Sequence, residues 1–234
     1  MISRLRDHPS GLHLGLMLAL TFSTGVVDAV GYLGLDRVFT GNMTGNVVIL
    51  AMAIADPSSK LPILGPVIAL ACFLIGAAIA GRMFKGLKAG WYPRTTVLLI
   101  CMALLLGIAA SSAFAVAVRP EPLNLAITGA MGLSMGAQAG SARHIGVADV
   151  TTVVVTSTLV GLAFDSRFGG GMDKHPWARR AGAILLIGAG AATGALLLHG
   201  GIGFGLLLAA VITAVVVVLG ALGRPHPVEG DPTN

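Results

Sequence analysis

Six long, predominantly apolar runs constrain this chain more than any other feature of its sequence. They are residues 11–35, 61–84, 95–118, 122–142, 178–199 and 201–223. An α-helix needs about 20 apolar residues to cross the hydrocarbon core of a bilayer. Helices and closed barrels are also the structures that satisfy all their backbone polar groups there. The runs therefore predict an all-α polytopic membrane protein with six transmembrane helices.

The composition supports lipid as the solvent and excludes several classes of function. The 234 residues are 55% hydrophobic and 11% charged, with a mean hydropathy of +0.88, whereas a soluble domain carries about 25% charged residues. The basic residues lie between the apolar runs and form no nucleic-acid-binding face. The two cysteines, Cys72 and Cys101, lie inside apolar runs without metal-ligand spacing. We expect no metal, no cofactor and no enzymatic activity, because no catalytic motif is present.

Two further apolar segments, 43–55 and 150–164, are short. At a rise of 1.5 Å per residue, such a segment reaches only about 20 Å. We expect both to form discontinuous or re-entrant helices, although short segments can cross where other helices shield them.

Charge supports the re-entrant alternative. With six crossings and a cytoplasmic N-terminus, Lys and Arg divide 12 to 3 in favour of the cytoplasm, whereas eight crossings give 9 to 6. The positive-inside rule favours the first arrangement. Because the run after Arg4 and Arg6 ends without a small-residue cleavage site, we interpret it as a retained first helix. The expected location is the bacterial inner membrane, with both termini in the cytoplasm.

The same order of long and short apolar segments occurs twice along the chain. "MTGNVVIL" (43–50) aligns with "VTSTLVGL" (155–162), and each segment follows a long helix and precedes two ordinary spans. Three crossings per unit place the second unit in the opposite orientation, which predicts an inverted 3+3 repeat. The predicted units are residues 1–118 and 122–223, followed by a disordered polar tail at 224–234.

Polar residues inside the apolar segments are the candidate substrate- or ion-binding groups. They are Asp28, Asn42, Thr44, Asn46, Gln138, Thr152, Thr156 and Thr158. A carboxylate within a membrane is costly and usually faces a partner or a cavity, so Asp28 is a coupling or coordination group. The alternative is a capping role near the outer surface, or an ion pair with Arg37. For the amide and hydroxyl residues, the alternatives are helix capping, packing and bonding to their own helix carbonyls.

Several of these motifs resemble the YoaK family of bacterial inner-membrane proteins. The resemblance covers residues 12–222 and rests on "TGVVDAVGYL", "FTGNMTGNVVIL" and "MGAQAGSARHIGVADVTTVVVTSTL". The second half of such proteins commonly reads Gln-Asn-Ala, a basic residue, Thr-Thr and Thr-Gly-Thr. Ala139 replaces the usual Asn and Ser157 the usual Gly, whereas the matching residues here are Gln138, Arg143, Thr151, Thr152, Thr156 and Thr158. The resemblance implies a six-span membrane protein of a largely uncharacterised family.

The architecture favours a small secondary transporter or channel with a central polar site at the repeat interface. Its expected partners are the lipid bilayer and a small polar or ionic solute. Proton coupling and a homo-oligomer stay open, and nucleic acid is excluded. The alternative is a non-transporting assembly or sensor protein, whose polar motifs only hold helices together.

Overall fold

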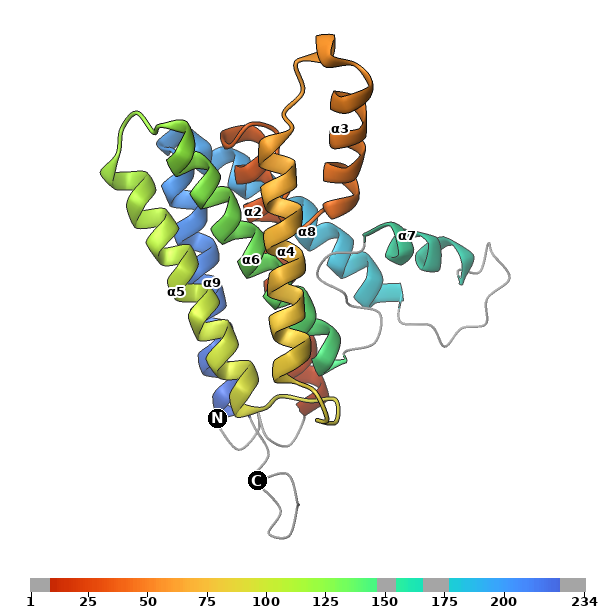
Figure 1. Ribbon diagram of the computed structural model, residues 1–234. Helices are drawn as coiled ribbons and strands as arrows, with labels where there is room; N and C mark the ends of the chain where they lie inside the picture. The colour runs from red at the N-terminus through yellow and green to blue at the C-terminus, as the bar shows by residue number, and fades with distance from the viewer. Residues whose placement is uncertain (1–8, 147–154, 166–176, 224–234) are drawn as a thin grey trace.

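The computed structural model describes residues 9–146, 155–165 and 177–223, and the regular structure of these residues is entirely helical (Figure 1). The long helices are α2 (Pro9–Gly34), α4 (Leu64–Met83), α5 (Pro93–Ala115), α6 (Glu121–Ile145), α8 (Trp177–Leu197) and α9 (Ile202–Leu222). The short helices are α3 (Met43–Ala55) and α7 (Val155–Phe164), and the single 3₁₀ turns are η1 (Pro57–Ser59) and η3 (Leu198–Gly200). Each predicted apolar run carries one long helix. The tail 224–234 lies outside the described residues.

Five of the long helices in the described part of the chain have the length and hydropathy of membrane spans: α2, α4, α5, α8 and α9. The sixth, α6, has 25 residues but lower hydropathy, since Ser134, Gln138, Ser141 and several glycines interrupt it. All three of these polar side chains are buried against neighbouring helices. In contrast, α4, α5 and α9 expose large apolar side chains such as Leu74, Leu104 and Val215. These surfaces suit lipid, and the chain is a polytopic membrane protein.

The long helices run up and down the bundle, so that chain segments distant in sequence meet at each end. One end packs the start of α2 against the end of α6 and the end of α9, through Leu16, Ile145 and Val217, with Trp91 from the α4–α5 connection. The other end joins Leu35 and Ile202. Because Gly65 at the start of α4 lies against Val38, α3 leaves and rejoins the bundle at this second end. Figure 1 shows α3 beside the bundle, not within it.

Glycines allow two pairs of long helices to approach backbone to backbone. A Cβ on Gly25 of α2 would lie 2.1 Å from the Ile187 carbonyl oxygen of α8, and one on Gly190 would lie 2.0 Å from the Phe22 oxygen. The pair α4 and α6 repeats the arrangement. There, Gly76 faces the Leu133 oxygen at 2.2 Å and Gly136 faces the Phe73 oxygen at 2.0 Å. Small residues at such contacts are the usual means of packing helices in lipid.

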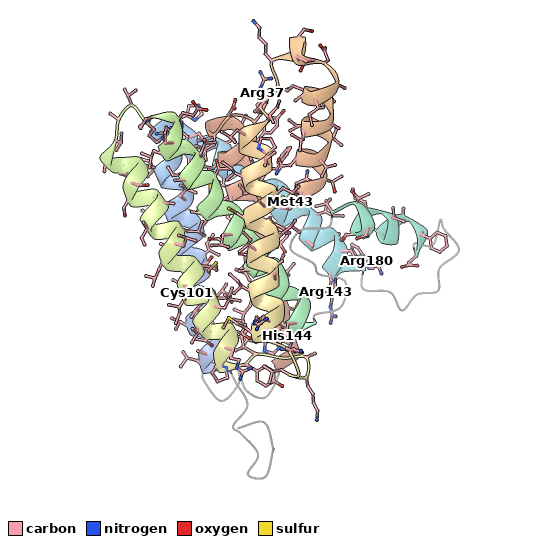
Figure 2. The ribbon with its side chains drawn as sticks, in the orientation of Figure 1. Arg37, Met43, Cys101, Arg143, His144 and Arg180 are labelled. Carbon is pink, nitrogen blue, oxygen red and sulfur yellow. The ribbon has the colours of Figure 1, made fainter. Side chains whose placement is uncertain are left out.

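The short helix α7 has no fully buried residue and is attached chiefly to α8. Arg180 of α8 donates from Nη1 to the Gly161 carbonyl oxygen at 2.7 Å and to Asp165 Oδ2 at 2.6 Å. The guanidinium thus binds a carbonyl near the C-terminal end of α7, where the helix dipole favours a cation. Figure 2 shows Arg180 on α8 beside this helix.

Candidate functional site

The turn before α3 is built around Asp28, which lies on α2 six residues before the end of that helix. Asp28 Oδ1 accepts hydrogen bonds from the backbone N–H groups of Thr40 and Gly41, at 2.8 and 2.6 Å, and a longer one from the Thr40 hydroxyl at 3.4 Å. Asp28 Oδ2 accepts from the Asn42 N–H at 3.1 Å. The carboxylate therefore holds the turn and lies at the positive end of α3. The sequence alternatives included an ion pair with Arg37, but the described contacts of Asp28 are to backbone and hydroxyl groups.

Asn46 fixes the same turn from the other side. Its side-chain oxygen accepts from the Phe39 N–H at 2.9 Å, and its Nδ2 donates to the Phe39 carbonyl oxygen at 2.6 Å. Asn46 is fully buried, whereas Asn42 is exposed and caps α3 by accepting from the Gly45 N–H at 3.3 Å. Asn42 thus satisfies an N–H in the first turn of α3, where the helix itself offers no partner, and Asn46 satisfies backbone groups of the preceding turn.

A cavity of about 600 Å³ opens beside this turn, between α2, the start of α3, the start of the described α7, and α8. Figure 2 labels Met43 at the end of α3 that is nearest α8. The lining residues are Thr24, Asp28, Tyr32, Phe39, Gly41, Asn42, Thr44, Gly45, Val48, Ile49, Val155, Thr156 and Ile187. Residues from both halves of the chain therefore share one cavity of the size typical of small-molecule sites.

Two hydroxyl groups of this cavity differ from six hydroxyls of the long helices that bond their own helix. Six Ser and Thr side chains donate to the carbonyl four residues earlier, at 2.8–2.9 Å: Thr21, Thr24, Ser111, Ser141, Thr193 and Thr213. Thr44 lies in the first turn of α3, where no such intrahelical carbonyl precedes it, and Thr156 is the second described residue of α7. Both are exposed, and the described residues offer neither hydroxyl a hydrogen-bond partner. Both threonines line the cavity.

The structure divides the residues that the sequence singled out. Asp28, Asn42, Thr44 and Thr156 line the cavity, whereas Asn46 and Thr158 do not. Gln138 is buried in α6 and donates to the Thr24 hydroxyl oxygen at 3.0 Å, so it lies directly behind a lining residue. Thr152 lies outside the described residues.

Sequence reasoning missed Thr24, Tyr32 and Phe39 among the lining residues. Thr24, Asp28 and Tyr32 are spaced four residues apart on α2, hence on one helical face. Starting from Asp28, this spacing could have revealed Thr24 and Tyr32. Phe39 has no comparable pattern in the sequence. Its ring stacks on Tyr32 with centroids 4.8 Å apart, which places an aromatic pair beside the carboxylate.

The described residues contain no group of three or more His, Cys, Asp or Glu side chains that could hold a metal ion. Cys72 and Cys101 are both free thiols. At the far end of α3, outside the long helices, hydrogen bonds from Ser58 lower the pKa of Asp56. That carboxylate is remote in sequence from the turn that Asp28 holds and does not line the cavity.

Comparison with known proteins gives a family for the chain. The model of a protein family of unknown function, DUF1275, matches residues 16–219. The UPF0700 transmembrane protein YoaK of Bacillus subtilis (strain 168) is 35% identical over 151 residues, which cover 64% of this chain and 65% of that protein. No solved structure matches. With its fold of apolar helices and a family match over most of its length, the chain belongs to the DUF1275 family of YoaK-like membrane proteins.

Proposed function

We propose that this protein is a small secondary transporter or channel for a small polar or ionic solute. One observation carries the proposal: a single cavity gathers, from both halves of the chain, a carboxylate, an exposed amide and two hydroxyls that have no partner among the described residues. Discontinuous helices near the centre of a transporter typically supply such groups. The proposal assigns the chain no enzymatic activity.

The proposal includes six membrane crossings, with α6 as the sixth. A helix of 25 residues is about 37 Å long, which exceeds the hydrocarbon thickness. Its lower hydropathy is compatible with a crossing because its polar residues face protein. Ser134, Gln138 and Ser141 are all at most 2% exposed.

An inverted repeat is the second part of the proposal, and the matched helix contacts support it. The partner of α2 is α8 and the partner of α6 is α4, while α3 packs on α4 as α7 packs on α8. Gly25 of α2, in the first half, contacts Ile187 of α8, in the second half. In the matching pair, Gly136 of α6 in the second half contacts Phe73 of α4 in the first half. Because the first unit contributes three long helices, the second unit begins at the opposite end of the bundle.

We further propose that both termini face the cytoplasm of a bacterial cell, with the protein in the inner membrane. The basic residues at the end of the bundle near Arg143 outnumber those near Arg37, and Figure 2 shows these two residues at opposite ends. This asymmetry follows the positive-inside rule.

Water access to the cavity tests the proposal. In a chain with Cys72 and Cys101 replaced by Ala, single cysteines at Thr44 and Thr156 are treated with a membrane-impermeant thiol reagent from each side. A transport pathway predicts labelling at both positions, with the reactive side changing when a solute is bound. Leu104→Cys is the control, because Leu104 is exposed on the lipid-facing surface of α5. It should resist the reagent from both sides.

A non-transporting assembly or sensor protein is the second candidate, and the hydrogen bonds of the turn favour it. Asp28 and Asn46 both hold backbone groups, so the motif has a structural task without any solute. This candidate predicts that the cysteines at positions 44 and 156 stay unreactive in the folded protein. That result would reject the transporter proposal.

A further inference from the structure

The charge of the cavity is unbalanced within the described residues. Asp28 is the one charged side chain among the lining residues, and no lysine, arginine or histidine accompanies it. A carboxylate without a basic partner in a partly enclosed site attracts a cation. The positive end of α3 does not make the cavity favour an anion, because the Asp28 carboxylate already lies against the N–H groups there. The lining therefore disfavours an anionic solute.

The carboxylate has little capacity left for a bare metal ion. Asp28 Oδ1 accepts three hydrogen bonds and Oδ2 accepts one, which leaves open lone-pair capacity mainly on Oδ2. Calcium takes six to eight oxygen ligands, and magnesium requires near-octahedral geometry. A single open carboxylate position suits a monovalent cation that contributes one N–H donor, or one that interacts through its charge alone.

The aromatic pair supplies the other half of a cation site. Tyr32 and Phe39 both line the cavity, and their rings stack on each other with centroids 4.8 Å apart. Tyr32 lies one helical turn after Asp28 on the same face of α2. Aromatic faces attract organic ammonium groups through the ring quadrupole. The cavity of about 600 Å³ is also far larger than a dehydrated alkali ion requires.

We infer that the cavity binds a small organic ammonium ion, with Asp28 as its counter-ion and the Tyr32–Phe39 pair as its aromatic wall. The inference rests on the proposed function in taking this cavity as the solute site. The hydroxyls of Thr44 and Thr156, which line the same cavity, accept hydrogen bonds from the polar groups of the solute. An ammonium N–H donates to Asp28 Oδ2, whereas a quaternary ammonium contacts the aromatic faces.

Ligand-induced thermal stabilisation of the full-length protein in detergent tests this inference without requiring transport. The probes are methylammonium and tetramethylammonium chloride, compared with sodium chloride and sodium sulfate at equal ionic strength and with tert-butanol as a neutral compound. We expect a saturable rise in Tm with one or both ammonium probes and none with the others. A preference between the two ammonium probes distinguishes N–H donation from cation–π contact.

Two kinds of variant separate recognition from folding. Tyr32→Leu removes an aromatic face without touching the hydrogen bonds of the turn, and we expect ammonium binding to weaken roughly 2- to 30-fold. Tyr32→Phe keeps the ring and should bind like the parent protein. Asp28→Asn should abolish the stabilisation, and its far-ultraviolet circular dichroism shows whether it is folded.

The outcomes separate the inference from the proposed function. Stabilisation by sulfate, by tert-butanol or by sodium alone would overturn the ammonium assignment, as would equal binding by Tyr32→Leu and the parent. The transport proposal would survive if cysteines at positions 44 and 156 were still labelled. Conversely, ammonium binding that depends on Asp28 and Tyr32, without water access from alternating sides, would support the inference and reject transport.

Discussion

At the scale of single residues, the polar side chains of this protein fall into two groups with different tasks. Asp28 and Asn46 satisfy backbone groups of the turn before α3. Thr44 and Thr156 are unpartnered among the described residues, although they belong to similar threonine-rich segments. For Thr44 the position explains this: a hydroxyl in the interior of a helix can bond the preceding turn, whereas Thr44 in the first turn of α3 has no intrahelical carbonyl before it.

The two hydrogen bonds between the Asn46 side chain and the Phe39 backbone, here called the Asn46 clamp, give a prediction on stability. Asn46→Ala leaves the N–H and carbonyl of Phe39 without their present partners in a partly buried turn, and we expect a loss of about 2 kcal/mol in the free energy of unfolding. Asn42→Ala is the matched comparison. It removes one exposed cap bond of 3.3 Å, with an expected cost of about 0.5–1 kcal/mol. Thermal unfolding in detergent measures both variants, and equal losses would contradict the assignment of Asn46 as the main clamp.

At the scale of elements, α6 shows how burial decides composition in a membrane protein. A helix that contacts lipid must be apolar, whereas one surrounded by helices can carry glycine, serine and glutamine. This is why α6 falls below the hydropathy of the other five long helices although it is nearly the longest. Its small residues let α4 approach, as Gly136 does at the Phe73 carbonyl.

The close contact between α2 and α8 predicts a contrast between two glycines of one helix. Gly190→Ala would place a Cβ 2.0 Å from the Phe22 carbonyl oxygen, so that the helices must separate. We expect destabilisation of about 1–3 kcal/mol, as for other overpacked sites. Gly188 is exposed and a Cβ there meets nothing within 4 Å. Gly188→Ala should therefore leave Tm unchanged or raise it slightly. A lower Tm for Gly188→Ala than for Gly190→Ala would contradict this packing.

At the scale of the whole molecule, the up-and-down order of the long helices determines at which end of the bundle each charged connection lies. The α3–α4 connection carries Lys60, and the α4–α5 connection carries Lys85, at opposite ends of α4. With six crossings and cytoplasmic termini, these two lysines lie on opposite sides of the membrane.

This topology predicts the labelling of two single-cysteine variants. Lys60→Cys in the chain without native cysteines should react with an impermeant thiol reagent in intact cells. Lys85→Cys should react only in inverted membrane vesicles. Labelling of both residues from the same side would contradict the arrangement, and the reverse pattern would place the termini outside. The cysteine-free parent reports the background reaction.

The sequence predicted the long helices closely, because the length of an apolar run is a local property. The run 122–142 corresponds to α6, which extends further to Ile145, and 43–55 corresponds to α3 without change. Composition also predicted the membrane environment, since the bulk of lipid imposes the same demand on every exposed residue. Hydropathy alone does not identify α6 as a span, because this helix carries buried polar residues such as Ser134 and Gln138.

The site was only half predictable, for a physical reason. Asp28, Asn42, Thr44 and Thr156 are visible in the sequence because a polar residue in an apolar run is costly and calls for a partner. Only the tertiary structure decided which partner each has, because Phe39 and Ile187 are far apart in the chain and meet at one cavity. Asn46, Thr44 and Asp28 look alike as polar residues in apolar surroundings. The turn at residues 39–42 gave Asp28 and Asn46 backbone groups to hold, whereas Thr44 has no hydrogen-bond partner among the described residues.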